Sequence, residues 1–298
     1  MSNNAQRGKD ALKELDRELK ARDRKENNKP WTIAAMALFI IALVGGGIYL
    51  ATTWGSDEDV VAEEETDEQQ EQQEQQPEEM EPVALNKERS EPLEPTVNCT
   101  YTEDGKGEFY KGLPEAEGVS TEGTVDLTLD TSAGPIGMTL DRSVSPCTVN
   151  AIEYLAKEGY YDDTVCHRLT TEGIHVLQCG DPSGTGSGGP GFEFADEYPV
   201  DDAAENEKPN ALYERGTIAM ANSGPNTNGS QFFLNYGDSP LPPAYTYFGT
   251  INDEGLATLD AIAEAGIAEP ESEEEAMMMR PGDGAPAEEV KINKASIA

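Results

Sequence analysis

The chain has 298 residues, and its 58 Asp and Glu against 21 Lys and Arg give a formal net charge of −37. This length allows one or two domains. Because a protein that binds DNA or RNA must present a basic surface to the phosphates, the charge excludes a nucleic-acid partner. The acidic composition instead indicates a well-hydrated protein that anionic surfaces repel.

An uncharged stretch near the N-terminus predicts a single membrane anchor. Residues 31–54 contain no charged side chain, and about 20 apolar residues suffice to cross a bilayer. Trp31 and Trp54 bracket the stretch, as aromatic residues do at membrane interfaces. Lys and Arg within residues 1–30 and acids after the stretch predict a cytoplasmic N-terminus and an extracytoplasmic remainder. A cleaved signal peptide is the alternative, which the long, acid-containing leading region disfavours.

Residues 55–95 have the composition of a linker. Residues 63–81 are nearly all Glu and Gln, so they cannot form an apolar core and are expected to be disordered. Residues 96–122 form an extension that is expected to pack against the folded domain over residues 123–298. Three aromatic side chains of the extension support this expectation: Tyr101, Phe109 and Tyr110.

Beyond residue 123 the pattern predicts a mainly β domain. Apolar and polar residues alternate over 124–130 and 137–141, which predicts a hairpin. Two helices are expected, over 147–158 after Pro146 and over 253–265. Further short strands are predicted over 166–170, 216–221, 231–236, 247–251 and 289–297. Many short strands with two helices predict a closed antiparallel barrel capped by helices.

The four cysteines lie on the predicted outer side of the membrane: Cys99, Cys147, Cys166 and Cys179. An even number in an oxidising compartment predicts two disulfide bonds, with three possible pairings. A zinc site is the alternative. It lacks a CxxC spacing and has only His167 and His175 to complete its ligands.

A polar loop between two predicted strands is the strongest candidate site. Residues 220–233 read MANSGPNTNGSQFF, a run of turn residues that ends in two aromatic side chains. A polar loop held beside an apolar patch is typical of a binding or catalytic site, and a structural Ω-loop is the alternative. Upstream, Arg168 lies in an otherwise apolar run, followed by VLQCGD at 176–181 and GTGSGGPG at 184–191.

These motifs, with YFGTI at 247–251, resemble in order the cyclophilin family of peptidyl-prolyl cis–trans isomerases. The resemblance runs from about residue 123 to the C-terminus and is greatest to a membrane-anchored bacterial member. It implies a closed eight-stranded barrel capped by two helices, no cofactor and no metal. It implies Pro-containing unfolded or extended polypeptides as substrates. The family's antiparallel strands would pair Cys166 with Cys179, which leaves Cys99 for Cys147.

The resemblance also implies a catalytic role for Arg168. The barrier to rotation of an X–Pro bond is about 18–20 kcal/mol because amide resonance is lost. An arginine that donates to the pyramidal nitrogen would favour the twisted amide; a surface ion pair is the alternative role for this side chain. Gln178 would hold the arginine and the substrate backbone, and the backbone of Asn222 would pair with the substrate ahead of the proline. The implied substrate-binding residues are His175, Val176, Ala221, Gln231, Phe233, Leu241 and Tyr245.

Three departures from the family pattern concern the site. Two extra residues lie near Thr170–Gly173, so the loop before Gln178 is expected to be rebuilt. His175 stands where the family usually has a pocket Phe. Pro240 replaces the usual Trp, which makes cyclosporin binding doubtful, and Tyr245 replaces the usual His.

Two function classes follow. The first is an anchored isomerase that accelerates the folding of secreted or envelope proteins. The second is a binding module that holds Pro-containing segments of an envelope partner with little or no turnover.

Overall fold

The computed structural model of the chain describes residues 81–105, 107–207, 210–270 and 280–298. All of them belong to one compact unit. The predicted cytoplasmic segment, the predicted span over residues 31–54 and most of the predicted linker lie outside these ranges. Among the residues that are described, no helix is both long and apolar enough to cross a membrane.

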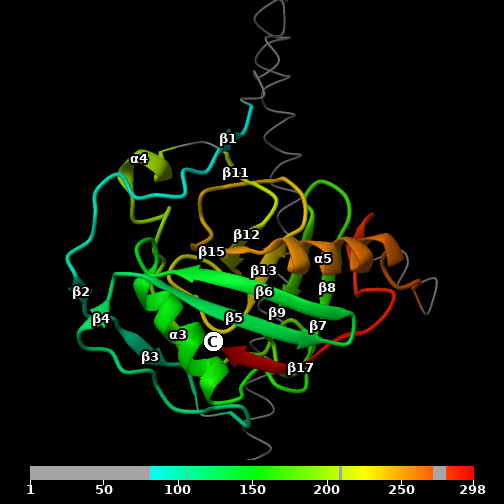
Figure 1. The fold of residues 1–298 in the computed structure, drawn as a ribbon, viewed down its shortest axis with the longest axis horizontal. Coiled ribbons are helices and arrows are strands. Elements are labelled where there is room, and N and C mark those ends of the chain that lie inside the picture. The colour runs from blue at the N-terminus through cyan, green and yellow to red at the C-terminus, as the bar shows by residue number, and fades with distance from the viewer. Residues whose placement is uncertain (1–80, 106, 208–209, 271–279) are drawn as a thin grey trace, which may run out of the picture. The chain divides into compact units, whose positions relative to one another are not determined.

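A sheet of ten strands is the largest sheet of the described structure and curls as a half-barrel (Figure 1). Its strands are β5 (Thr124–Thr131), β6 (Gly134–Asp141), β7 (Thr164–Cys166), β8 (Arg168–Thr170), β9 (Val176–Cys179), β12 (Thr217–Met220), β13 (Phe232–Asn235), β15 (Tyr247–Ile251), β16 (Asp283–Gly284) and β17 (Val290–Ile297). The order across the sheet is β16-β8-β9-β13-β12-β15-β6-β5-β17-β7, and every pairing is antiparallel.

This sheet confirms the mainly β prediction and differs from the predicted closed eight-stranded barrel. The extended stretch over residues 164–170 is divided at His167, so that β7 pairs with β17 while β8 pairs with β9. Strand β16, which was not predicted, adds a further partner for β8. With β7 and β8 taken together and β16 set aside, eight strands remain.

Both predicted helices are present. Helix α3 (Pro146–Lys157) begins with its proline in the first turn, where the missing N–H costs no hydrogen bond, and it buries Val149, Ile152 and Leu155. Helix α5 (Asp253–Ala265) is capped at its N-terminus by Asn252, whose side chain accepts a hydrogen bond from the Gly255 N–H. These helices pack against β17 and β6, respectively. A third helix, the four-residue α4 (Ala203–Asn206), was not predicted.

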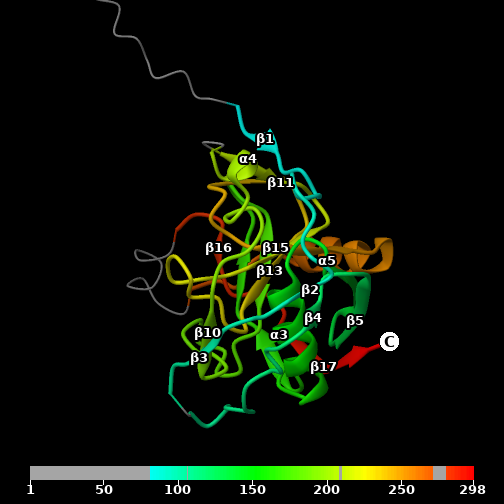
Figure 2. The same cartoon turned by 90° about the vertical axis from the view of Figure 1, so that its left-hand side faces the viewer.

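The predicted linker ends earlier than residue 95, because residues 83–90 lie against the domain; we call them the strap. In the strap, β1 (Val83–Ala84) pairs in parallel with β11 (Ala211–Tyr213), which also pairs with β14 (Ser239–Leu241). Leu85 is 3% exposed. Strands β1 and β11 lie near α4 at one end of the molecule in both views (Figures 1 and 2).

The extension over residues 96–122 packs on the domain, as predicted. Its β2 (Thr96–Val97) pairs with its own β4 (Val119–Ser120), and its β3 (Tyr101–Glu103) pairs with β10 (Phe192–Phe194). The ring of Tyr101 meets the rings of both Phe192 and Phe194 edge-on, at centroid distances of 5.6 and 5.7 Å. Phe109 is 36% exposed, so it contributes less to this packing than Tyr101, which is 8% exposed.

Both disulfide pairings that the resemblance implied are confirmed: Cys99 bonds to Cys147, and Cys166 bonds to Cys179. The first bond fastens the extension to helix α3. The second joins β7 to β9. Because no cysteine is free, the zinc alternative loses its thiolate ligands.

The buried apolar residues form two clusters. The larger one fills the space between the sheet and helices α3 and α5. The smaller one lies beside β11 and β14, and it consists of Leu85, Val144, Val176, Tyr198, Ala211, Tyr213, Ala219, Phe233 and Tyr247. The candidate site opens above this smaller cluster.

Candidate active site

A pocket of about 190 Å³ lies where β8, β9 and β13 meet the segments that follow β12 and β14. Its lining consists of Arg168, Ile174, Val176, Gln178, Ala221, Asn222, Phe233, Leu241 and Tyr245. Pockets for drug-sized ligands hold roughly 300–1,000 Å³, so this smaller pocket suits a single side chain. Apolar side chains form most of its lining, and polar groups come from Arg168, Gln178 and Asn222.

Phe233 forms the floor of the pocket. It lies on β13 and is 5% exposed, and the Tyr245 ring meets it edge-on at a centroid distance of 5.6 Å. Successive side chains of a strand point to opposite faces, so Phe232 points away from the pocket and contacts Tyr161 in the larger core cluster. The two adjacent phenylalanines therefore serve the pocket and the core separately.

The guanidinium group of Arg168 is fixed on two sides. Its Nε and Nη2 donate to Asp283 Oδ1 and Oδ2 at 2.7 and 2.8 Å, and its Nη1 donates to Gln178 Oε1 at 3.2 Å. A guanidinium has five N–H donors. Among the described residues, these bonds leave one N–H on Nη1 and one on Nη2 for a ligand.

The pairing keeps both groups charged. The hydrogen bonds from Arg168 hold the pKa of the Asp283 carboxyl below its usual value, although partial burial acts in the opposite direction. The same hydrogen bonds raise the pKa of the Arg168 guanidinium. The site therefore presents a permanent cation at the edge of an apolar pocket.

Hydrogen bonds extend from Arg168 to the glycine-rich loop. Gln178 Nε2 donates to Gln231 Oε1 at 2.9 Å, and Gln231 Nε2 donates to the carbonyl oxygens of Gly186 and Gly188 at 3.0 and 2.9 Å. Asp181 fixes the same loop by accepting from the Gly188 N–H at 3.0 Å. The cation and the loop are thus parts of one hydrogen-bonded network.

Asp181 is itself fully buried. Burial alone would raise the pKa of its carboxyl, but hydrogen bonds from Gly188 and Ser183 together hold that pKa below its usual value. The carboxylate therefore stays ionised and continues to accept the backbone N–H groups that shape the loop.

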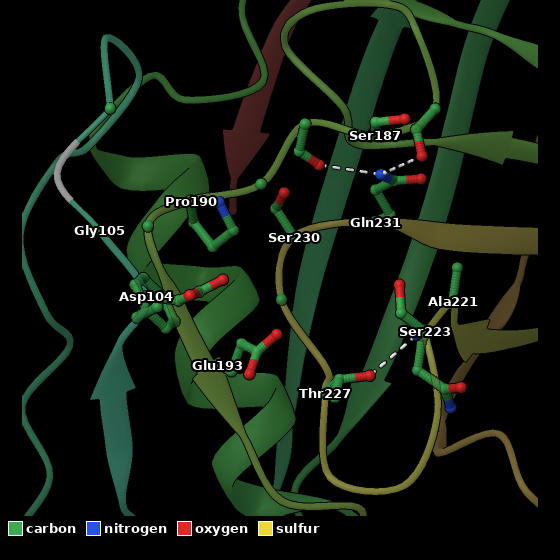
Figure 3. A pocket seen from close by; sticks show the side chains of 18 of the residues that line it. Asp104, Gly105, Ser187, Pro190, Glu193, Ala221, Ser223, Thr227, Ser230 and Gln231 are labelled. Atoms are coloured by element: carbon green, nitrogen blue, oxygen red, sulfur yellow. Dashed lines mark hydrogen bonds between the residues drawn. The ribbon is translucent and has the colours of Figure 1, made fainter. Parts of the chain in front are cut away.

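A second, larger pocket of about 680 Å³ adjoins the first and shares Gln178, Ala221 and Asn222 with it. Figure 3 shows Asp104 and Glu193 on one side of this pocket and Ala221 and Gln231 on the other. Asp104 belongs to the extension, which therefore contributes directly to the surface around the site.

The polar loop over residues 221–231 is held in place by its own side chains. Asn222 Nδ2 donates to the Ala244 carbonyl at 2.9 Å, and Asn222 Oδ1 accepts from the Gly224 N–H at 3.2 Å. Ser230 Oγ donates to the Gly180 carbonyl at 2.7 Å. The loop is thus an ordered segment, and it lines both pockets.

Nine of the ten residues predicted for the site line the two pockets. Gln231 lines only the larger one, and the other eight line the smaller one: Arg168, Val176, Gln178, Ala221, Asn222, Phe233, Leu241 and Tyr245. His175 is the exception. Its ring lies against Tyr236 at a centroid distance of 5.8 Å, and its Nδ1 is 3.3 Å from the Asp238 carbonyl oxygen. Ile174 takes its place in the pocket because the longer loop before β9 changes which neighbour faces inward.

Asp283 was also missed. It lies 115 residues after Arg168 in a segment of Gly, Pro and acids that lacks a strand pattern. The only sequence signal was an unpartnered arginine in an apolar setting, which requires a counter-charge without indicating where it lies.

The fold and the pocket together define a class of protein, and comparison with known sequences agrees. The family described as cyclophilin type peptidyl-prolyl cis-trans isomerase/CLD matches residues 124–297. The chain belongs to this family.

Individual relatives are similar to this chain over part of their length. The chain is 51% identical over 202 residues to a probable peptidyl-prolyl cis-trans isomerase B of Mycobacterium leprae, covering 66% of this chain and 65% of that protein. It is 51% identical over 178 residues to the protein of the same description in Mycobacterium tuberculosis, covering 58% of each. The matched segments thus span less than two thirds of these relatives.

Among solved structures, a cyclophilin type peptidyl-prolyl cis-trans isomerase of Cryptosporidium parvum is similar at 30% identity. The similarity covers 59% of this chain and 98% of that one, with a TM-score of 0.47.

Proposed function

We propose that the chain is a peptidyl-prolyl cis–trans isomerase whose catalytic group is Arg168. One observation carries the proposal: a cation with two unused N–H donors lines a small apolar pocket that has Phe233 as its floor. The pocket suits the ring of a proline. The cation then lies beside the amide that precedes that ring.

The chemistry requires no covalent intermediate. Rotation about an X–Pro bond takes tens to hundreds of seconds because resonance opposes it. When the amide twists, its nitrogen becomes pyramidal and gains a lone pair that can accept a hydrogen bond. A donor that binds the twisted amide better than the planar one lowers the barrier. Arg168 supplies that donor, and Gln178 and Asp283 fix its direction.

The substrate is a Pro-containing segment of an unfolded or extended polypeptide. The proline occupies the smaller pocket, and neighbouring residues extend into the larger one past Asn222, whose backbone pairs with them. The acids Asp104 and Glu193 in the larger pocket favour basic residues near the proline.

The enzyme acts outside the cytoplasm, anchored by residues 31–54 as a single-pass membrane protein, on secreted or envelope proteins. The uncharged stretch supports the anchor. The two disulfide bonds support the compartment, because such bonds persist in oxidising surroundings and are rare in the cytoplasm.

Exchange NMR on a peptide with one Ala–Pro bond, with the full chain in detergent at catalytic concentration, tests the proposal. Cis and trans resonances that exchange too slowly to connect in the peptide alone should show exchange peaks when the chain is added. Peptide resonances that shift without faster exchange would indicate a binding module instead. If the peptide resonances neither shift nor exchange, the pocket does not bind the proline of this peptide.

A further inference from the structure

Asp283 contacts the proposed catalytic group, Arg168, but lies outside the sequence motifs on which the family resemblance rests. Its two carboxylate oxygens accept from Nε and Nη2 of Arg168 at 2.7 and 2.8 Å, in the bidentate arrangement that is the strong form of this ion pair. Asp283 lines neither pocket. Any effect that it has on a bound peptide must therefore pass through Arg168.

The backbone that carries Asp283 is fixed against the strand that carries Arg168. In the β16–β8 pairing, Asp283 lies opposite Thr170, and the Thr171 N–H donates to the Gly282 carbonyl at 2.7 Å. Gly282 has a φ of +67°, and a Cβ there would lie 2.7 Å from the Glu172 Cβ. Only glycine meets both conditions, so the carboxylate is held at a defined place.

Fixing one edge of the guanidinium determines where the opposite edge points. A free arginine side chain samples many rotamers, and ordering it during catalysis would add to the barrier. With Nε and Nη2 bound to Asp283 and Nη1 bound to Gln178, the plane of the group is set before a peptide arrives. The remaining Nη2 donor lies on the Nη1–Nη2 edge, in a residue that lines the pocket.

We propose that Asp283 is a positioning residue that holds the Arg168 guanidinium in the orientation needed to donate to the twisted X–Pro amide. This inference rests on the proposed function. It adds that the segment after helix α5 supplies the carboxylate that orients the catalytic guanidinium.

A second arginine–aspartate pair provides a matched control. Arg215 Nη1 and Nη2 donate to Asp260 Oδ1 and Oδ2 at 2.7 and 2.8 Å, and neither residue lines either of the two pockets described above. The Arg215 and Arg168 side chains are similarly exposed, at 39% and 37%. Loss of the control pair removes the same kind of contact without touching the site.

The test measures kcat, KM and Tm of the full chain for Asp283→Asn and Asp260→Asn, each also made in an Arg168→Ala background. Asp283→Asn should lower kcat by about tenfold to a hundredfold, as misplaced catalytic groups do, with KM within about twofold. Asp260→Asn should change neither constant. In the Arg168→Ala background, Asp283→Asn should have no further effect, because the two residues act as a unit.

An unchanged kcat for Asp283→Asn would overturn the inference, and so would an equal loss in the Arg168→Ala background. Failure of the wild-type chain to accelerate exchange would count against the proposed function alone, so the positioning role also needs a readout without turnover. The ¹⁵N resonance of Arg168 Nε–H should be sharp in the wild type and in Asp260→Asn and should broaden in Asp283→Asn. A sharp, unmoved resonance in Asp283→Asn would show that Asp283 does not order the guanidinium.

Discussion

At the scale of single residues, the site depends on a few close contacts between side chains and backbone. Gly188 makes two of these contacts. A Cβ on this residue would lie 1.9 Å from Asp181 Oδ1, the carboxylate that shapes the glycine-rich loop. The Gly188 carbonyl also accepts from Gln231, which in turn accepts from Gln178. A change at this position should therefore reach the arginine network.

Gly188→Ala should displace the Asp181 carboxylate and weaken the loop, at a cost of about 1–3 kcal/mol in the free energy of unfolding. Peptides that extend into the larger pocket should show a higher KM. Gly189→Ala is the control, because a Cβ there meets nothing within 4 Å. Thermal unfolding and peptide kinetics of both variants measure the effect; equal behaviour of the two would contradict this account of the loop.

How far residues could be assigned from the sequence depended on how local their signals are. Arg168, Gln178 and Phe233 lie in continuous motifs, so their place in the pocket was predicted. His175 was predicted in the pocket, but Ile174 lines it instead. The two extra residues in the preceding loop change which of the two faces the pocket, and the conformation of that loop cannot be read from spacing. Asp283 comes from a two-residue strand that has no alternation to detect.

At the scale of elements, the strap links the start of the described chain to the pocket. Its strand β1 pairs with β11, and β11 pairs with β14, which carries Leu241 of the pocket. Leu85 belongs to the same buried cluster as Phe233. Arg89 strengthens the attachment, because its Nε donates to the Val144 carbonyl at 2.8 Å and its Nη2 pairs with Asp201 at 2.9 Å.

Leu85→Ala should lower the free energy of unfolding by about 2–4 kcal/mol, the usual cost of truncating a buried leucine. Tm should fall by several degrees. Val83→Ala is the matched control on the same strap, since Val83 is 49% exposed, and its effect should stay within about 0.5 kcal/mol. Equal Tm values for the two variants would mean that the strap does not stabilise the domain.

The elements differ in how well the sequence predicted them. The β5–β6 hairpin and helices α3 and α5 have clear periodicity and were predicted to within a few residues. The strap was assigned to the linker because its apolar residues form a short run in an acidic, proline-containing stretch. The strap is buried against a surface of the folded domain, and that surface cannot be read from the sequence of the strap itself.

At the scale of the whole molecule, the extension and the half-barrel are one unit held by covalent bonds as well as packing. Cys99–Cys147 closes a loop of 48 residues between the extension and helix α3, and Cys166–Cys179 closes one of 13 residues beside Arg168 and Gln178. The resemblance gave both pairings. It gave no role for the extension, because the residues that the family shares begin after it.

Replacing Cys99 and Cys147 together by Ser should lower the free energy of unfolding by about 4 kcal/mol, from the loop-closure entropy that the longer crosslink removes from the unfolded chain. Replacing Cys166 and Cys179 together should cost about 3 kcal/mol by the same reasoning. Denaturant unfolding of the two double variants under oxidising conditions measures both losses. A wild-type midpoint for either variant would show that its bond contributes no stability.

The central claim is that Arg168 stabilises the twisted amide more than the bound planar peptide, and kcat and KM of Arg168→Ala against the wild type test it most directly. Loss of one well-placed donor typically costs about 10²–10³-fold in kcat. We expect a loss of that size, with KM changed only slightly, because the proline pocket remains. A wild-type kcat for Arg168→Ala would contradict the claim. If only KM changed, Arg168 would be a binding residue and not a catalytic one.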